Sequence, residues 1–508
     1  MLKLIKDTRW TTFLLAFIVI WLSSCNQSKE NKELNFLLIM SDNQSWNHSG
    51  AYGDLIVKTP HFDSISAQGI RFTQAFCAAP SCAPARAALL TGQDIWRLEE
   101  GANLWGTLPT KFKVMPDLLE HAGYEIGYSG KGWGPGDVEA SNRKRNPGGN
   151  KYDSFKEFIV ELASSKKKKP WFFWHSSREP HRPFDRGPEK EATLPIDNIT
   201  VPLYLPDTPD VRQDIADYYG SIQRFDDEIG SIIADLKQSG DFDNTIIIIC
   251  SDNGWQMPRG LANLYDSGTR VPLIFFNEKL LAKGSTQNAI VNLNDVTPTI
   301  LELAGLKIPS EMTAKSLVPL IQRNDGIKRS GSFASKDEVF MGRERHAYVR
   351  EDGLGYPARA IRTSSYLYIK NYEPDRWPAG DPPLFGDVDA HMMHYPSLSK
   401  AFMIQNKNHV AVKPLFDLAF AKRPAEELYD LAKDPDQLHN LAKEITHEDI
   451  KNSMNKRLIE YLVETGDPRE TNGHIKWDEY YYYKEVDKNP KPSPEYIKML
   501  GLDQSYNY

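Results

Sequence analysis

The stretch Cys77-Ala-Ala-Pro-Ser-Cys82-Ala-Pro-Ala-Arg86-Ala-Ala-Leu-Leu-Thr-Gly92 has an unusual order of residues. Cys82 stands two residues before Pro84 and four before Arg86, and an apolar run follows. This order predicts a helix that begins near Cys82. The amide N–H groups at a helix start and the cation of Arg86 both favour an anion beside Cys82. From these residues alone two other interpretations remain open: a buried cysteine that only packs, and a Cys77–Cys82 disulfide in an exported protein.

The composition is that of a large globular protein. Its 508 residues are 40% hydrophobic, enough to bury a large core, and we expect one large and one smaller domain. The net charge of −7, with both signs mixed along the chain, argues against nucleic acid as a partner. An anionic ligand would therefore need a local cationic site.

The N-terminus has the pattern of a targeting segment. Three basic residues precede an apolar run from Phe13 to Leu22, which is too short to span a bilayer comfortably. The run ends in Leu-Ser-Ser-Cys25, which resembles a bacterial lipobox. We therefore expect a lipoprotein signal peptide at 1–24, a lipid anchor at Cys25 that holds the exported protein to a membrane, and a polar tether at 25–33. The alternative is an ordinary secretory signal with an incidental cysteine.

Oxygen-bearing side chains follow two predicted strands. The apolar runs 36–40 and 245–250 are typical of buried parallel strands, and each is followed by an acid and an amide: Asp42-Asn43 and Asp252-Asn253. Open α/β sheets place their ligand sites at the carboxyl ends of strands. One such pair alone is more often a turn or a helix cap. Two pairs predict one site for a hard divalent cation, Ca²⁺ or Mg²⁺.

These motifs together resemble the type I sulfatases. Cys82-x-Pro-x-Arg86 followed by Ala-Leu-Leu-Thr-Gly is similar to the signature of that family, and the resemblance runs in order from about Asn35 to about Ala442. The motif order is most similar to the branch of heparan N-sulfatases and bacterial polysaccharide sulfatases. The resemblance implies an α/β fold, with an alkaline-phosphatase-like large mixed sheet flanked by helices and a smaller C-terminal α+β domain that carries an antiparallel sheet. We place the catalytic domain at 34–355 and the C-terminal subdomain and tail at 356–508.

The resemblance also implies a nucleophile and a metal. In this family a formylglycine-generating enzyme oxidises the cysteine that Cys82 matches to formylglycine (3-oxoalanine), whose hydrate attacks sulfur and then expels sulfate. One divalent cation, Ca²⁺ with Mg²⁺ as the alternative, would be held by Asp42, Asn43, Cys82, Asp252 and Asn253. Many family members have Asp where this chain has Asn43, so the predicted shell carries one negative charge fewer.

Arg86, Lys131 and His181 are the other catalytic residues that the resemblance implies. Lys131 lies in Gly-Lys-Gly-Trp133 after a predicted strand, and His181 lies in Pro-His-Arg-Pro. Together they would surround the sulfate, with His181 as the general acid. Trp133 stands where the family usually has His, and we predict that it stacks on a sugar.

The segment after Asn253 departs most from the family pattern. Leu261 stands where members usually have Lys, four residues before the aromatic position that Tyr265 matches. Arg259 lies two residues earlier, and we expect it to bind the substrate in place of the missing cation.

The C-terminal part contributes further candidates. Residues 339–343 look like a last strand of the large sheet, one that delivers Arg345 and His346 to the rim of the site as substrate-binding groups. Residues 360–370 have hairpin character. The aromatic tail 480–483 either covers the core or lines a substrate cleft.

The predicted function is the release of inorganic sulfate from a sulfated poly- or oligosaccharide, with O- and N-linked sulfate both open. A phosphatase or phosphodiesterase of the same superfamily is one alternative, although those enzymes use Thr or Ser as the nucleophile and commonly two metals. The second alternative is a non-catalytic lipoprotein that binds sulfated glycans. Its only support is that Trp133 and Leu261 replace expected site residues.

Overall fold

The computed structural model describes residues 33–165, 168–184, 194–322, 337–387, 397–484 and 493–502. The predicted signal peptide, Cys25 and nearly all of the predicted tether lie outside these ranges. Leu34–Tyr508 forms one compact unit. Within the described ranges, none of the helices has the length and apolar character needed to cross a membrane.

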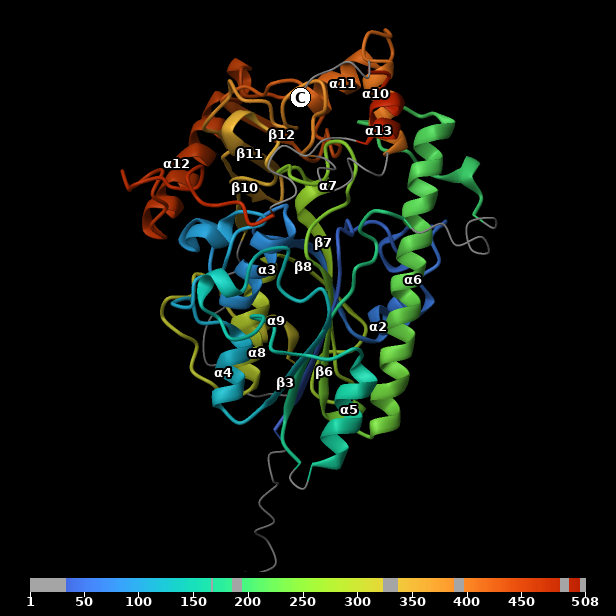
Figure 1. Cartoon of the computed structure of the whole chain (residues 1–508), viewed down its shortest axis with the longest axis vertical. Helices are drawn as coiled ribbons and strands as arrows, with labels where there is room; N and C mark the ends of the chain where they lie inside the picture. Colours follow the sequence, from blue (N-terminus) through green and yellow to red (C-terminus); the bar gives the residue numbers. More distant parts are fainter. Residues whose placement is uncertain are drawn as a thin grey trace, which may run out of the picture. The chain divides into compact units, whose positions relative to one another are not determined.

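A mixed sheet of eight strands lies at the centre of this unit (Figure 1). The strand order is β4-β3-β5-β1-β6-β7-β2-β8; β7 is antiparallel to both of its neighbours, and every other pair is parallel. The strands are β1 (Asn35–Ser41), β2 (Ile70–Phe76), β3 (Glu125–Gly130), β4 (Asn150–Lys151), β5 (Trp171–Ser176), β6 (Thr245–Ser251), β7 (Arg270–Phe276) and β8 (Ser285–Asn292).

Helices cover both faces of this sheet, which is why its central strands are continuous apolar runs. Successive β1 side chains point to opposite faces: Phe36 and Leu38 pack into one core cluster, and Leu37 and Ile39 into another. The first face is covered by α3 (Cys82–Thr91), α4 (Met115–His121), α8 (Val296–Leu303) and α9 (Val318–Ile321), and the second by α2 (Pro60–Gln68), α5 (Phe155–Ser164) and α6 (Pro209–Ser239) (Figure 1). The predicted α/β architecture is confirmed.

The smaller sheet is antiparallel, with the order β12-β11-β10-β9, and α12 (Glu448–Glu464) packs against it. Its strands are β9 (Glu338–Arg343), β10 (Ala358–Thr363), β11 (Tyr366–Asn371) and β12 (Glu426–Asp430). The predicted hairpin is the β10–β11 pair. The prediction for 339–343 was wrong, because β9 pairs with β10 and its Val339 and Met341 pack with the small sheet's apolar face. The small sheet therefore begins before residue 356. The remaining α-helices of the described residues are α7 (Asp266–Thr269), α10 (Leu398–Gln405), α11 (Lys413–Phe420) and α13 (Pro494–Met499).

Two helices matter most for the site. The first, α3, begins at Cys82 as predicted, is buried along its whole length, and is followed by Gly92, whose φ of 62° gives the left-handed conformation common after helices. The second, α6, is 31 residues long, and the Thr208 hydroxyl caps it by accepting from Val211 N at 3.4 Å. Helix α2 begins at Pro60, and the Thr59 hydroxyl does not cap it but donates to Asp63 Oδ1 at 3.0 Å.

At Gly130, the last residue of β3, the backbone of the neighbouring strand leaves no room for a side chain. Its φ is 77°, and a Cβ there would lie 2.0 Å from Ser176 O, the carbonyl that accepts a hydrogen bond from Lys131 N. We predict that Gly130→Ala lowers the free energy of unfolding by about 2 kcal/mol more than Gly123→Ala. Gly123 is the matched control, since it also has a positive φ (98°) but nothing within 4 Å of its Cβ position. Urea unfolding of both variants measures the difference; equal losses would contradict the prediction.

Candidate functional site

The two predicted acid–amide pairs converge at the carboxyl ends of β1 and β6. These strands are parallel neighbours, with Ser41 opposite Ser251, so the residues that follow them lie side by side. Asn43 has a φ of 69°, in the left-handed region, and its backbone N donates to Asp252 Oδ1 at 3.0 Å. The amide of Asn253 donates to Asn43 Oδ1 at 2.7 Å. Adjacent parallel strands thus bring together side chains that are 209 to 210 residues apart in sequence.

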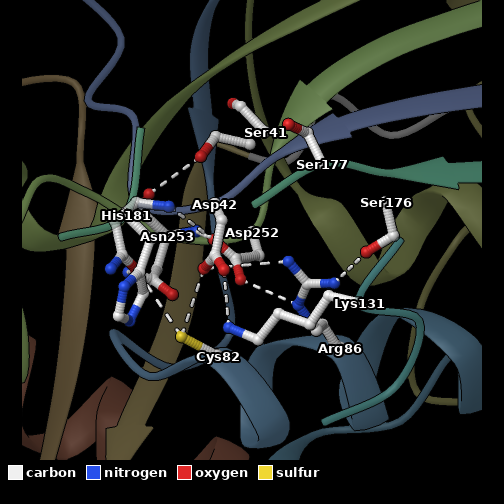
Figure 2. Close-up of polar contacts among 12 residues, drawn as sticks. Ser41, Asp42, Cys82, Arg86, Lys131, Ser176, Ser177, His181, Asp252 and Asn253 are labelled. Atoms are coloured by element: carbon white, nitrogen blue, oxygen red, sulfur yellow. Dashed lines mark hydrogen bonds and ion pairs between the residues drawn. The ribbon is translucent and has the colours of Figure 1, made fainter. Parts of the chain in front are cut away.

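Cys82 faces this group from the first turn of α3 (Figure 2). Its Sγ lies 3.4 Å from Asp42 Oδ1 and 3.6 Å from Asn43 Oδ1. One ligand atom from each of Asp42, Cys82 and Asp252 lies within 4.8 Å of the others, and all three residues are buried. Cys77, Cys82 and Cys250 are free cysteines, so the Cys77–Cys82 disulfide is not formed.

Two cations approach the carboxylates from one side in Figure 2. Arg86 Nε donates to Asp252 Oδ2 at 2.8 Å, and its Nη2 lies 3.8 Å from Asp42 Oδ1. Its Nη1 donates to Gly132 O at 2.7 Å and to the Ser176 hydroxyl. Lys131 Nζ donates to Asp42 Oδ2 at 2.6 Å. The fixed guanidinium is wholly buried, whereas the Lys131 side chain keeps 15% of its surface exposed, so Lys131 is the cation nearer to solvent.

Burial and the neighbouring charges together set the protonation states of Asp42, Asp252 and Cys82. Burial alone would raise the pKa of Asp42, but Lys131, His181 and Arg86 outweigh it and hold the pKa of this carboxyl well below its ordinary value. Burial raises the pKa of Asp252 despite Arg86. Burial and the charge of Asp42 raise the pKa of the Cys82 thiol well above its ordinary value. Cys82 is therefore a neutral thiol here, and a neutral thiol is a poor nucleophile.

His181 lies on the opposite side of the group, next to Asn253 in Figure 2. It belongs to the loop after β5, and its Nδ1 bonds the backbone carbonyl of Arg182. A carbonyl can only accept, so Nδ1 carries the hydrogen and Nε2 is the nitrogen that can gain or lose a proton. Burial lowers the pKa of His181 from its ordinary value.

A buried amide oxygen favours a cation at this place. Asn253 Nδ2 donates to both Asn43 Oδ1 and Gly254 O, which fixes the orientation of its amide group. Asn253 Oδ1, wholly buried, then has no hydrogen-bond partner among the described residues. A buried oxygen without a donor is costly, and a hard cation between it and the two carboxylates would satisfy it. The donor set fits a divalent cation of the Ca²⁺ or Mg²⁺ type.

Two residues of the site had not been predicted. Ser176, at the end of β5, accepts from Arg86. Gln256 Oε1 accepts from Asn43 Nδ2 at 3.3 Å and from the backbone N of Arg182 at 3.1 Å. The only signal in the sequence was position, since Ser176 follows the apolar run 171–174 and Gln256 follows Asn253 by three residues.

Two predicted substrate-binding residues near the cluster have other contacts. Trp133 is 2% exposed and packs in the main core, while its backbone pairs with the Asn146 amide, so the prediction that it offers a face to a sugar was wrong. Arg259 donates to Leu418 O at 2.9 Å and to Gln437 O, and its guanidinium lies over the Tyr265 ring at 3.8 Å. These contacts hold the loop against the C-terminal part, and they give no support to Arg259 as the replacement cation. Leu261 is buried.

The two rim residues after β9 differ from each other. Arg345 is buried and donates to Gly353 O at 3.3 Å and Tyr480 O at 2.6 Å, so it fastens the aromatic tail and was wrongly predicted to bind substrate. His346 Nδ1 lies 2.8 Å from the hydroxyl of Ser81, the residue before Cys82. Burial lowers the pKa of His346 to about 4, so this imidazole is neutral beside the site.

Comparisons with known proteins agree with this geometry. A family model described as sulfatase matches residues 34–306, and one described as N-sulphoglucosamine sulphohydrolase, C-terminal, matches residues 256–381. Human N-sulphoglucosamine sulphohydrolase is 26% identical over 483 residues, covering 85% of this chain and 91% of that protein. An ulvan-active sulfatase of Formosa agariphila is 27% identical over 446 residues, covering 85% and 80%.

The fold has solved counterparts as well. A protein solved in complex with its substrate D-glucosamine-2-N,6-O-disulfate gives a TM-score of 0.61 at 17% identity, and the alignment covers 86% of this chain and 99% of that one. At this identity the likeness supports the fold alone. The sulfatase model, however, matches more than half of the chain, including every residue of the buried cluster. This chain belongs to the sulfatase family.

Proposed function

We propose that this protein removes sulfate from a sulfated oligo- or polysaccharide, with a formylglycine made from Cys82 as the nucleophile. The observation that carries the proposal is the position of Cys82, at the first turn of α3, 3.4 Å from Asp42 Oδ1 and in the same buried cluster as Arg86 and Lys131. Sulfate ester hydrolysis is the chemistry of the family to which the chain belongs. The finer points below are our proposals.

The electrostatics support a modified residue at position 82. Reactive cysteines have a lowered thiol pKa, whereas burial and Asp42 raise that of Cys82. An aldehyde in its hydrated form offers a hydroxyl nucleophile, and the second hydroxyl gives a route for releasing sulfate afterwards. Arg86 and Lys131 then stabilise the negative charge on the sulfuryl oxygens, because both are already held in place before the substrate binds.

We infer that one divalent cation, Ca²⁺ or Mg²⁺, binds among Asp42, Asn43, residue 82, Asp252 and Asn253. The support is the convergence of two carboxylates with the unpartnered Asn253 Oδ1. Such a cation acts as a Lewis acid toward sulfuryl oxygens and acidifies a bound hydroxyl. The chain's own contribution is to orient the carboxylates: Arg86 and Lys131 each hold one of them in place.

The proposed substrate class rests on the relatives. The two compared above are named for an N-sulphated glucosamine and for ulvan. We therefore propose a sugar sulfate as the substrate, with the linkage, O or N, left to experiment. We also propose that the chain is exported and held to a membrane through Cys25, and that a formylglycine-generating enzyme matures Cys82. The sequence pattern before residue 26 and the Cys82-x-Pro-x-Arg86 motif support these two points.

The first test of this function removes the sulfur. Cys82→Ala is expected to abolish sulfate release, by about 10⁴-fold or more, because no hydroxyl nucleophile can then form at residue 82. Cys77→Ala is the matched control, a buried free cysteine changed in the same way. Ion chromatography of sulfate released from a panel of sulfated disaccharides measures both variants. A Cys82→Ala variant with the wild-type rate would contradict the proposal.

The second test removes the cation. Dialysis against a strong chelator is expected to abolish activity and to lower the melting temperature by a few degrees, since Asp42 and Asp252 then face each other without the cation. Adding Ca²⁺ or Mg²⁺ should restore both. Full activity in protein shown by elemental analysis to contain no metal would refute the cation.

A further inference from the structure

The loop that carries His181 is fastened to α6 on both sides of that residue. Before it, Glu179 accepts from Arg224 Nε at 3.1 Å and from the Ser221 hydroxyl. After it, Arg182 Nη1 forms an ion pair with Asp214 Oδ1 at 2.7 Å. His181 therefore lies between two anchors on one helix.

The spacing along α6 explains how one helix can provide both anchors. Asp214 and Ser221 are seven residues apart, about two turns, so they lie on the same face. Both are buried within a helix face whose other inward positions are mostly apolar, such as Ile215 and Ile222. Asp214 and Ser221 thus interrupt the apolar face of α6 next to the His181 loop, where they bind the side chains of Arg182 and Glu179.

Arg182 has more contacts than the ion pair alone. Its residue is 5% exposed, its Nε donates to Gln256 O at 3.2 Å, and its guanidinium lies over the Phe184 ring at 4.2 Å. Its backbone N donates to Gln256 Oε1, the oxygen that also accepts from Asn43 Nδ2. Arg182 thus connects the loop to the cation-binding cluster through one shared amide.

Asp214 is held from its other side by the start of α10. Its Oδ2 accepts from the Ser397 hydroxyl at 3.3 Å and from Ser399 N at 3.1 Å. Both carboxylate oxygens are therefore engaged and the residue is 1% exposed. A buried ion pair with satisfied hydrogen bonds has one defined geometry, because any displacement leaves a desolvated charge without its partner.

The contact between Arg182 and His181 is through the backbone. The carbonyl of Arg182 accepts from His181 Nδ1, so the position of residue 182 sets both the tautomer and the ring orientation of the histidine. We propose that the buried Arg182–Asp214 pair is a positioning device, which holds His181 so that Nε2 faces the sugar atom that leaves sulfur. This inference rests on the proposed function. As sulfur forms its new bond to a hydroxyl oxygen of residue 82, its bond to the leaving atom breaks. The protonated form of His181 gives its Nε2 proton to that atom and returns to the neutral form, which keeps its Nδ1 hydrogen on the Arg182 carbonyl.

Two substrates with different leaving groups can separate the positioning role of the Arg182–Asp214 pair from a general loss of structure. Asp214→Asn keeps the shape and can still accept from the two serines, but it removes the charge that holds Arg182. We expect kcat for a sulfated disaccharide to fall by about 10- to 100-fold and kcat for 4-nitrophenyl sulfate by less than about threefold, since nitrophenolate leaves without a proton. KM for both substrates should change less than about threefold, because Arg86 and Lys131 are untouched.

Asp207→Asn is the matched control. Asp207 lies on the surface just before α6 and forms a 2.6 Å ion pair with Arg212, which lies in the first turn of that helix. The Asp207→Asn variant should change neither rate. Equal losses on the two substrates, or no loss on either, would overturn the inference.

Hydrogen exchange provides a readout that does not depend on turnover. Backbone amides of residues 177–184 should exchange faster in Asp214→Asn than in the wild type or in Asp207→Asn. Unchanged exchange in this loop would overturn the positioning role by itself. By contrast, a wild-type protein that releases no sulfate from either substrate would contradict the proposed function, and the exchange result would still decide whether the pair holds the loop.

Discussion

The buried contact between Arg86 and Asp252 is the interaction on which the rest of the site depends. Taking two charges out of water is costly, and removing one partner of such a pair typically costs about 3–5 kcal/mol. Further hydrogen bonds offset this cost, because Arg86 also donates to Gly132 O and to the Ser176 hydroxyl, and Asp252 accepts from Asn43 N. It joins helix α3, which carries Cys82, to the ends of β1, β5 and β6. The nucleophile position and the oxygen cluster are thereby held together before any ligand binds.

The fold explains why these charges can meet. Parallel strands β1 and β6 end at the same edge of the sheet, and α3 begins there, so its N-terminal amides and Arg86 both lie beside Cys82. Helix α6 packs on the face of the large sheet opposite to α3, and its residues Asp214 and Ser221 hold the His181 loop in place. Helices from both faces of the sheet therefore contribute to one site, which lies at the edge where strands β1 and β6 end.

Much of this could be predicted from the sequence, and the reasons for success and failure are physical. Asp42, Asn43, Asp252 and Asn253 were found because they directly follow continuous apolar strands, and strand ends converge in a parallel sheet. Strand β9 was assigned to the wrong sheet because pairing partners depend on contacts across the chain, which a local apolar run does not specify. Trp133 and Arg345 were misjudged for a similar reason: residue type suggests sugar or anion binding, but both side chains are buried in other contacts. The Arg182–Asp214 pair gave no local signal, since its two partners are 32 residues apart.

The most direct test of the central claim is the mass of the tryptic peptide from Phe72 to Arg86, taken from protein made in its own cell. If residue 82 is the nucleophile as a formylglycine, the peptide will have lost one sulfur and two hydrogens and gained one oxygen, and fragmentation will place the change at Cys82. A peptide that carries only the intact thiol in protein that releases sulfate would contradict the formylglycine at residue 82.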